Sequence, residues 1–398
     1  MNKNNSQAGL ALMLAALAAI GPFTIDAYLP AFPEIGAELG ADKGAVQETL
    51  SLYLLTFGLM TLWHGAFSDS FGRKRVILAG LIVYALASLG CALATSIEML
   101  WWMRIAQGLS AGAGMVVSRA MVRDIYAEGP GAQQLMSKIA LMFAIAPAVA
   151  PIIGGWILRF FGWRAIFVFL ALAAIGLCLI CKWKLPESLP PEKRQPFAIS
   201  ALFHGYKNVF SNVRFLLLAF GLGAFFGGFF FYVLSAPVFI REHLGLDETQ
   251  FHWLFVPSMV GTMVGAWISG RIAGRWDERR TLRLAFAMMG IGAFINLVAS
   301  CFWPSSLPFA VLHFIPYTLG VAIAMPNVTL MMLDIFPKTR GMAASCQSCV
   351  QTTFNAFLAS VLVPLLWHSR TGMAFGMAGL GMMGAIIVFG SLKARRQK

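Results

Sequence analysis

Charged residues are scarce in this sequence. Asp, Glu, Lys and Arg make up only 12% of its 398 residues, about half the share found in soluble globular proteins. Hydrophobic residues make up 59%, and the mean hydropathy is +0.74. This balance argues against a soluble protein and favours one that crosses a bilayer many times.

Long apolar segments are abundant. A bilayer-spanning helix needs about 20 mostly apolar residues. The short alternating segments of a polar-lumen barrel are absent from the sequence. The sequence therefore predicts an all-α membrane protein with twelve transmembrane helices, near residues 9–30, 44–66, 76–95, 98–118, 135–157, 163–183, 214–236, 250–270, 282–302, 305–327, 341–366 and 370–392.

Positive charge is unevenly distributed along the chain. The net charge of +13 could indicate a nucleic-acid partner, but its placement argues against one. With the N-terminus inside, 24 of the 30 Lys and Arg residues fall on the cytoplasmic side. This excess orients a protein in the bilayer, so both termini are predicted to be cytoplasmic. The apolar start resembles a signal peptide, but its run continues to Pro30 and favours a retained first helix.

Residues that would build a catalytic or metal site are also few. Two of the six cysteines are spaced as Cys178–Cys181 and two as Cys346–Cys349, a pattern that suggests zinc or redox chemistry in a soluble protein. Both pairs lie in apolar segments, so we expect small buried side chains, no metal and no cofactor. The short loops contain no phosphate-binding glycine loop or nucleophile elbow, which argues against an enzyme.

One long polar connection divides the chain. Residues 182–208 contain four prolines and alternating charges, with six predicted spans on either side. The two halves also match: Tyr28 falls on Tyr232 at an offset of 204 residues, and Gly65 on Gly270 at an offset of 205. We therefore predict two pseudo-symmetric six-helix bundles joined by a cytoplasmic linker, with bounds 1–183, 184–213 and 214–398. Duplicated bundles are the architecture of the major facilitator transporters, although another duplicated carrier or channel would share it.

The loop after the second span resembles the signature loop of the major facilitator superfamily. The matching positions in "GAFSDSFGRKR" are Gly65, Asp69, Gly72, Arg73, Lys74 and Arg75. Glycine permits a tight turn between two closely packed helices, and Asp69 and Arg73 are spaced to pair locally. The resemblance implies a latch that holds the two halves together on the cytoplasmic side during part of the transport cycle. The alternative is a plain topology signal.

The fourth span resembles another motif of the superfamily. Arg104, Gln107, Gly108 and Ala111 lie on one helical face. An arginine inside the membrane is costly and should have a partner. The alternative is an interfacial arginine that extends outward.

The fifth span carries Pro147, Pro151, Gly154 and Gly155. Their spacing resembles the fifth-helix motif of the drug antiporters, except that Ala150 stands where the usual glycine precedes proline. Proline and glycine allow a bend and a close helix approach, and ordinary packing glycines are the alternative.

Asp26 is a carboxylate inside the first span. It lies a few residues before the outer end of that span, and Arg104 lies about six residues after the outer start of the fourth. We therefore expect these opposite charges at similar depth. Burial favours a neutral carboxyl group and a nearby arginine favours a charged one, which suits a group that exchanges protons. The alternative is a permanent structural salt bridge.

Several segments narrow the resemblance. "PFTIDAYLPAFP", "SRAMVRDIY", "APIIGGW" and "LPES" resemble the bicyclomycin/chloramphenicol-resistance branch of drug:proton antiporters, over nearly the whole chain. The resemblance implies that Asp26 is the proton-coupling carboxylate and that Asp124 is a partner of Arg73 in the latch. Ala18 stands where some relatives have a second acid, which argues against a second proton or divalent-cation site.

The second half lacks a carboxylate deep in any span. It offers Phe225 and Phe226 in the seventh span, and Gln347, Gln351 and Asn355 on one face of the eleventh. Rings could stack on a planar solute and amides could hydrogen-bond it. The alternatives are lipid-facing phenylalanines and amides that hold helices together. The predicted substrate contacts are Asp26, Arg104, Gln107, Phe225, Phe226, Gln351 and Asn355.

These features predict a proton-driven exporter of drugs or other amphipathic small molecules in a bacterial inner membrane. Its partners would be protons, a small-molecule substrate and lipid, and a monomer would suffice. A carrier for one metabolite, such as a nucleoside, a sugar or a siderophore, is the alternative and should have a narrower substrate range. A channel would show no saturation and no need for a pH gradient.

Overall fold

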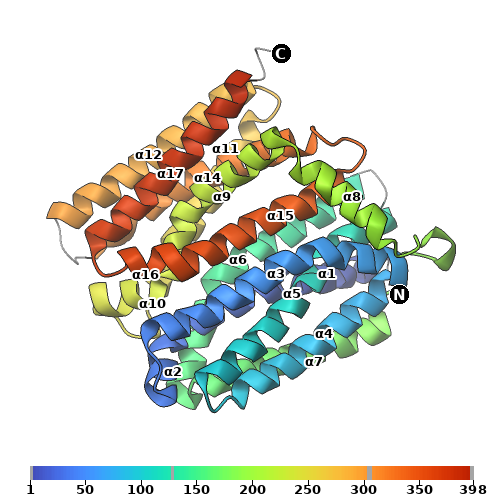
Figure 1. The fold of residues 1–398 in the computed structure, drawn as a ribbon, viewed down its shortest axis with the longest axis horizontal. Helices are drawn as coiled ribbons and strands as arrows, with labels where there is room; N and C mark the ends of the chain where they lie inside the picture. Colours follow the sequence, from blue (N-terminus) through green and yellow to red (C-terminus); the bar gives the residue numbers. More distant parts are fainter. Residues whose placement is uncertain (1–2, 127–129, 303–306, 395–398) are drawn as a thin grey trace. The chain divides into compact units, whose positions relative to one another are not determined.

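The protein is described by a computed structural model that covers residues 3–126, 130–302 and 307–394. Within these ranges the chain is helical and contains no strand (Figure 1). Among the residues that the structure describes, ten helical segments are long and apolar enough to cross a membrane: Gly9–Leu39, Lys43–Phe71, Arg73–Ala92, Trp163–Lys184, Val213–Leu234, His252–Ile272, Glu278–Phe302, Phe309–Leu333, Arg340–Leu366 and Arg370–Leu392. Two more long helices, α5 (Ile97–Tyr126) and α6 (Pro130–Phe161), stand between the third and fourth of these, so a helix corresponds to each of the twelve predicted spans.

The remaining long helices of the N-terminal half are α1 (Lys3–Tyr28), α3 (Lys43–Phe71), α4 (Arg73–Ala92) and α7 (Trp163–Lys184). Those of the C-terminal half are α9 (Val213–Leu234), α11 (His252–Ile272), α12 (Glu278–Phe302), α14 (Phe314–Leu333), α15 (Arg340–Phe357) and α17 (Arg370–Ala394). Shorter elements extend or join them: η1 (Leu29–Ala31), α2 (Phe32–Leu39), η2 (Pro191–Lys193), α8 (Ile199–Phe210), α10 (Ala236–Val238), η3 (Phe239–His243), α13 (Phe309–Leu312), η4 (Leu358–Leu362) and α16 (Val363–Leu366).

Helix boundaries follow local chemistry. Helix α1 ends at Tyr28 and is followed by a 3-10 turn that contains Pro30. Proline has no N–H and therefore cannot continue the hydrogen-bond pattern of the α-helix. Helix α2 ends at Gly40, which has φ +63°. Helix α3 then starts after Asp42, whose side chain accepts a hydrogen bond of 2.7 Å from Ala45 N.

The chain forms two compact units, Met1–Phe203 and His204–Lys398. In the first, α5 packs against α1, α3 and α4, while α1 also packs on α6 and α4 on α7. In the second, α14 packs against α9, α11 and α12, while α9 also packs on α15 and α12 on α17. These five pairs of long helices correspond in the two units when the helices are taken in chain order, as the internal repeat predicts. The boundary between the units falls inside α8.

Glycines bring α1 unusually close to two neighbours. A side chain at Gly114 of α5 would overlap the carbonyl group of Leu17, and one at Gly154 of α6 would overlap that of Ala27. Small residues permit this approach between membrane helices because no Cβ separates the backbones. Helix α1 is therefore held close to both α5 and α6, and its contact with α6 lies one residue away from Asp26.

Candidate functional site

Buried polar side chains from four helices gather inside the first unit. Each is at most 5% exposed, although the surrounding helices are strongly apolar. Burying a polar group is unfavourable unless it finds partners, so such a cluster indicates a functional region or a structural network. The cluster consists of Thr24, Asp26 and Tyr28 on α1, Thr49 and Tyr53 on α3, Tyr84 and Ser88 on α4, and Arg104 and Gln107 on α5.

Arg104 is the centre of this cluster and is completely buried. Its guanidinium carbon lies 4.6 Å from the centre of the Tyr28 ring and 4.3 Å from that of Tyr53. Its Nη1 donates a hydrogen bond of 2.6 Å to Gln107 Oε1, while Nε and Nη2 have no hydrogen-bond partner. The cation is thus stabilised by aromatic faces and an amide dipole. This burial differs from the interfacial alternative, in which the arginine extends outward.

Hydrogen bonds hold the groups around Arg104 in place. Gln107 Nε2 donates to Ser88 Oγ at 2.8 Å, and Ser88 Oγ donates to the carbonyl of Tyr84 at 2.7 Å. The hydroxyl groups of Tyr28 and Thr49 share a bond of 2.7 Å. Tyr53 donates to the carbonyl of Gly21 at 3.0 Å. We call the rings of Tyr28 and Tyr53 the aromatic cage of Arg104. Hydrogen bonds thus connect this cage and the Gln107 amide to α1, α3 and α4.

Asp26 is 5% exposed and lies within electrostatic range of Tyr53. Ion pairs of the first unit include those of Arg73, Arg164 and Arg194, and among the described residues neither Asp26 nor Arg104 forms one. The structure therefore differs from the permanent salt bridge considered above. A carboxyl group buried without a cationic partner is easiest to accommodate in its neutral form.

The small residues predicted on the Arg104 face lie at helix contacts. Gly108 lies against the carbonyl of Tyr53 and the hydroxyl of Thr56, so any side chain there would separate α5 from α3. Ala111 is buried.

The proline–glycine motif of α6 flanks the same region. Pro147 is half-buried, whereas Pro151, Gly154 and Gly155 are buried. Gly154 makes the close contact with Ala27 described above. The motif therefore contributes to the position of α1 in this structure.

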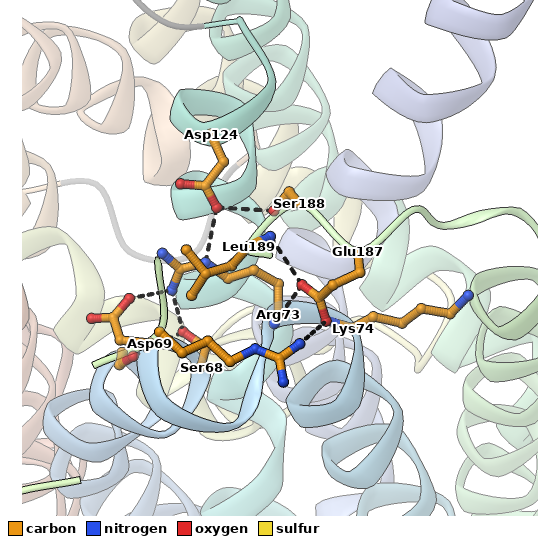
Figure 2. Close-up of polar contacts among 10 residues, drawn as sticks. Ser68, Asp69, Arg73, Lys74, Asp124, Glu187, Ser188 and Leu189 are labelled. Carbon is orange, nitrogen blue, oxygen red and sulfur yellow. Dashed lines mark hydrogen bonds and ion pairs between the residues drawn. The ribbon is translucent and has the colours of Figure 1, made fainter. Parts of the chain in front are cut away.

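A second polar network lies where α3 ends and α4 begins (Figure 2). Arg73 Nη1 donates to Asp69 Oδ1 at 2.5 Å and to Ser68 Oγ at 2.6 Å, and its Nε donates to Asp124 Oδ2 at 3.0 Å. The side chain of Arg73 is 8% exposed, that of Asp124 20% and that of Asp69 45%. One guanidinium thus joins the ends of α3 and α5 to the start of α4. The turn itself needs Gly72, which has φ +96°.

Gly65 lies one turn before this network on α3. A side chain there would be in ordinary contact with Val116 of α5, at 3.9 Å.

The residues predicted in the second half are not all equivalent. Phe225 is completely buried, with its ring centre 5.6 Å from that of Phe286 on α12. Phe226 is half-buried and stacks on Phe230 at 5.5 Å. Phe225 therefore lies in the core of its unit, and we keep only Phe226 in the substrate surface proposed below.

The amides of α15 differ in the same way. Gln347 is engaged, because its Nε2 donates to Thr329 Oγ1 at 2.9 Å. Asn355 is 5% exposed and its Oδ1 has no hydrogen-bond partner. Gln351 is half-buried. Asn355 thus has an acceptor available for a solute.

Sequence reasoning missed the tyrosines. Tyr28, Tyr53 and Tyr84 each place a hydroxyl in an apolar segment, and each is almost completely buried. The available signal was the match between Tyr28 and Tyr232. Tyr232 is also buried and accepts a hydrogen bond of 2.8 Å from Asn296 Nδ2.

Comparison with known proteins agrees with this architecture. YdgK of Bacillus subtilis (strain 168), named an uncharacterized MFS-type transporter, is 31% identical over 391 residues, 97% of this chain and 96% of the relative. A bicyclomycin resistance protein homolog of Haemophilus influenzae is 28% identical over 403 residues, 100% of this chain and 99% of the relative. The crystal structure of the human organic anion transporter MFSD10 has a TM-score of 0.68 and 18% identity, covering 98% of this chain and 100% of that one.

The sequence profile of the Major Facilitator Superfamily matches residues 12–353, so this chain belongs to that superfamily.

Proposed function

We propose that this protein exports drugs or other amphipathic small molecules in exchange for protons, across a bacterial cytoplasmic membrane, with both termini in the cytoplasm. The observation that carries the proposal is a buried Asp26 without an ion pair, in the same polar cluster as an Arg104 whose Nε and Nη2 are unpartnered. The name of the Haemophilus influenzae relative, a bicyclomycin resistance protein homolog, supports the substrate class.

The coupling follows from the cost of burying charge. A neutral Asp26 is tolerated in this interior, whereas an ionised one needs hydration or a cation. A hydrogen-bond donor or cationic group on a substrate would pair with an ionised Asp26, and the two unpartnered nitrogens of Arg104 would donate to an acceptor group of the same substrate. Proton and substrate would therefore compete, with proton uptake from outside favouring release of substrate and proton loss to the cytoplasm allowing the next binding event.

The other residues have separate roles in the proposal. Gln107 holds Arg104, since both ends of its amide are already bonded. Phe226, Gln351 and Asn355 supply a ring face and amide groups for the solute. Asp69, Gly72, Arg73 and Asp124, with Gly65 one turn earlier, form the cytoplasmic latch, and Pro147, Pro151, Gly154 and Gly155 position α1.

Transport in proteoliposomes tests the proposal. Purified protein would be given an imposed pH gradient and a panel of bicyclomycin, chloramphenicol and ethidium, beside the variants Asp26→Asn and Asp26→Glu. We expect Asp26→Asn to lose gradient-driven accumulation by about ten-fold or more while still exchanging substrate without a gradient. Asp26→Glu, which keeps a titratable group, should retain part of it.

Asp42→Asn is the matched control. It makes the same chemical change at an exposed helix cap, where asparagine also caps well, and should transport normally. Gradient-driven transport by Asp26→Asn at the wild-type rate would contradict the coupling role. A response to only one compound of a wider panel would favour a carrier for a single metabolite.

A further inference from the structure

The chain that follows α7 folds back onto the latch network. We call residues 185–197 the strap. The strap lies within the first unit and contacts the ends of all three helices that the network joins. Its contacts start at Glu187 and continue to Phe197, so they are not one isolated hydrogen bond.

Glu187 caps the start of α4. Its Oε1 accepts a hydrogen bond of 2.9 Å from Arg73 N, and its Oε2 accepts one of 3.2 Å from Lys74 N (Figure 2). The first N–H groups of a helix have no partner within the helix and usually rely on the side chain of the preceding residue. That residue is Gly72, which has no side chain to offer. The cap therefore comes from Glu187, which lies 114 residues after Arg73 in the sequence. Its negative charge is also favourable near the positive end of the helix dipole.

The same contact needs glycine at position 72 for a second reason. A Cβ on Gly72 would lie 2.7 Å from Glu187 Oε2 and 2.9 Å from Arg194 Nη2. Arg194, also in the strap, pairs with Glu187 at 3.9 Å. Gly72 thus leaves room for the carboxylate as well as adopting the backbone conformation of the turn.

The rest of the strap contacts the other two helix ends. Ser188 Oγ donates to Asp124 Oδ2 at 2.9 Å, the same oxygen that accepts from Arg73 Nε. Gln195 N donates to the carbonyl of Asp69 at 3.2 Å. The ring centre of Phe197 lies 5.3 Å from that of Phe67. Two neighbouring residues of the strap therefore act on Arg73. Glu187 accepts a hydrogen bond from its backbone N–H, and Ser188 contacts its guanidinium indirectly, through Asp124.

We propose that Glu187 is a positioning residue for Arg73 and that the strap is a working part of the cytoplasmic latch, an inference that rests on the latch role in the proposed function. Glu187 fixes the backbone from which Arg73 extends, and Ser188 orients the carboxylate that receives its guanidinium. Because the strap begins the connection from the first unit to the second, displacement of that connection would withdraw the cap from α4 and loosen Arg73.

Hydrogen exchange of the full-length protein in nanodiscs tests the cap directly. In Glu187→Ala we expect the amides of Arg73 and Lys74 to exchange about ten-fold faster than in the wild type, because their acceptor is lost. Glu187→Gln, which keeps one acceptor oxygen, should be intermediate. The control is Glu192→Ala, an exposed position in the same strap, which should leave these amides unchanged. Equal exchange in Glu187→Ala and the wild type would overturn the proposal.

Transport tests whether the cap acts through Arg73. Glu187→Ala should lower the maximal rate roughly three-fold or more, with KM and the proton:substrate ratio unchanged. In an Arg73→Ala background, the same change should have no further effect. An equal loss in both backgrounds would show that Glu187 does not act through Arg73. Failure of all gradient-driven transport by the wild type would overturn the proposed function instead, and the exchange comparison would still decide the cap.

Discussion

The guanidinium carbon of Arg104 lies 4.3 Å from the centre of the Tyr53 ring, and both side chains are completely buried. The Tyr28 ring lies on the same cation at 4.6 Å. Aromatic faces attract a cation without carrying a charge of their own. Arg104 can therefore remain in the interior without an acidic partner, which leaves Asp26 unpaired.

Removing the Tyr53 ring should destabilise the protein more than removing its hydroxyl. Tyr53→Phe keeps the ring face over Arg104 and loses the hydroxyl with its bond to Gly21, whereas Tyr53→Leu loses both the ring and the hydroxyl. We expect Tyr53→Leu to cost about 2 kcal/mol more than Tyr53→Phe, since the desolvated cation–π contact is lost. Thermal unfolding of the purified protein measures the difference. Equal unfolding temperatures would contradict the aromatic cage.

A methyl group at Gly154 should separate α6 from α1. The new Cβ would overlap the carbonyl of Ala27, so the helices must move apart next to Asp26. We expect Gly154→Ala to lower the unfolding temperature and to reduce transport several-fold. Gly176→Ala is the control, because nothing lies within 4 Å of a Cβ there, and alanine in a helix is favoured over glycine by about 1 kcal/mol. Similar effects at both positions would contradict the close contact.

Arg73 should not be replaceable by lysine. Its guanidinium donates simultaneously to Ser68, Asp69 and Asp124, and a single ammonium group cannot reproduce that fork. Arg73→Lys should slow turnover roughly ten-fold while leaving equilibrium substrate binding unchanged. Arg75→Lys, at an exposed position two residues away, should be neutral. A loss of substrate affinity in Arg73→Lys would argue against a latch and for a binding role.

The fold was largely predictable because its signals are local. About twenty consecutive apolar residues suffice to predict a span. The turn between the second and third spans was recognised from the spacing of Asp69, Gly72 and Arg73 along the sequence. The pairing of Arg73 with Asp124, which the resemblance implied, is present in the structure.

Contacts between distant segments were not predictable in the same way. The sequence placed Asp26 and Arg104 at similar depth and left a salt bridge as the alternative, but depth does not fix the direction of a side chain around a helix axis. The rings of Tyr28 and Tyr53 lie against the guanidinium of Arg104 instead. The hydrogen bond by which Glu187 caps α4 at Arg73 joins residues 114 positions apart, and no local sequence pattern predicts that contact.

The most direct test of the central claim is proton release on substrate binding. Purified protein in weakly buffered detergent solution would be mixed with bicyclomycin, chloramphenicol or ethidium, and the pH change followed for the wild type, Asp26→Asn and Asp42→Asn. The account predicts release of protons by the wild type and by Asp42→Asn as substrate binds, and none by Asp26→Asn although it still binds. Release of as many protons by Asp26→Asn as by the wild type would contradict the claim that substrate and proton compete at Asp26.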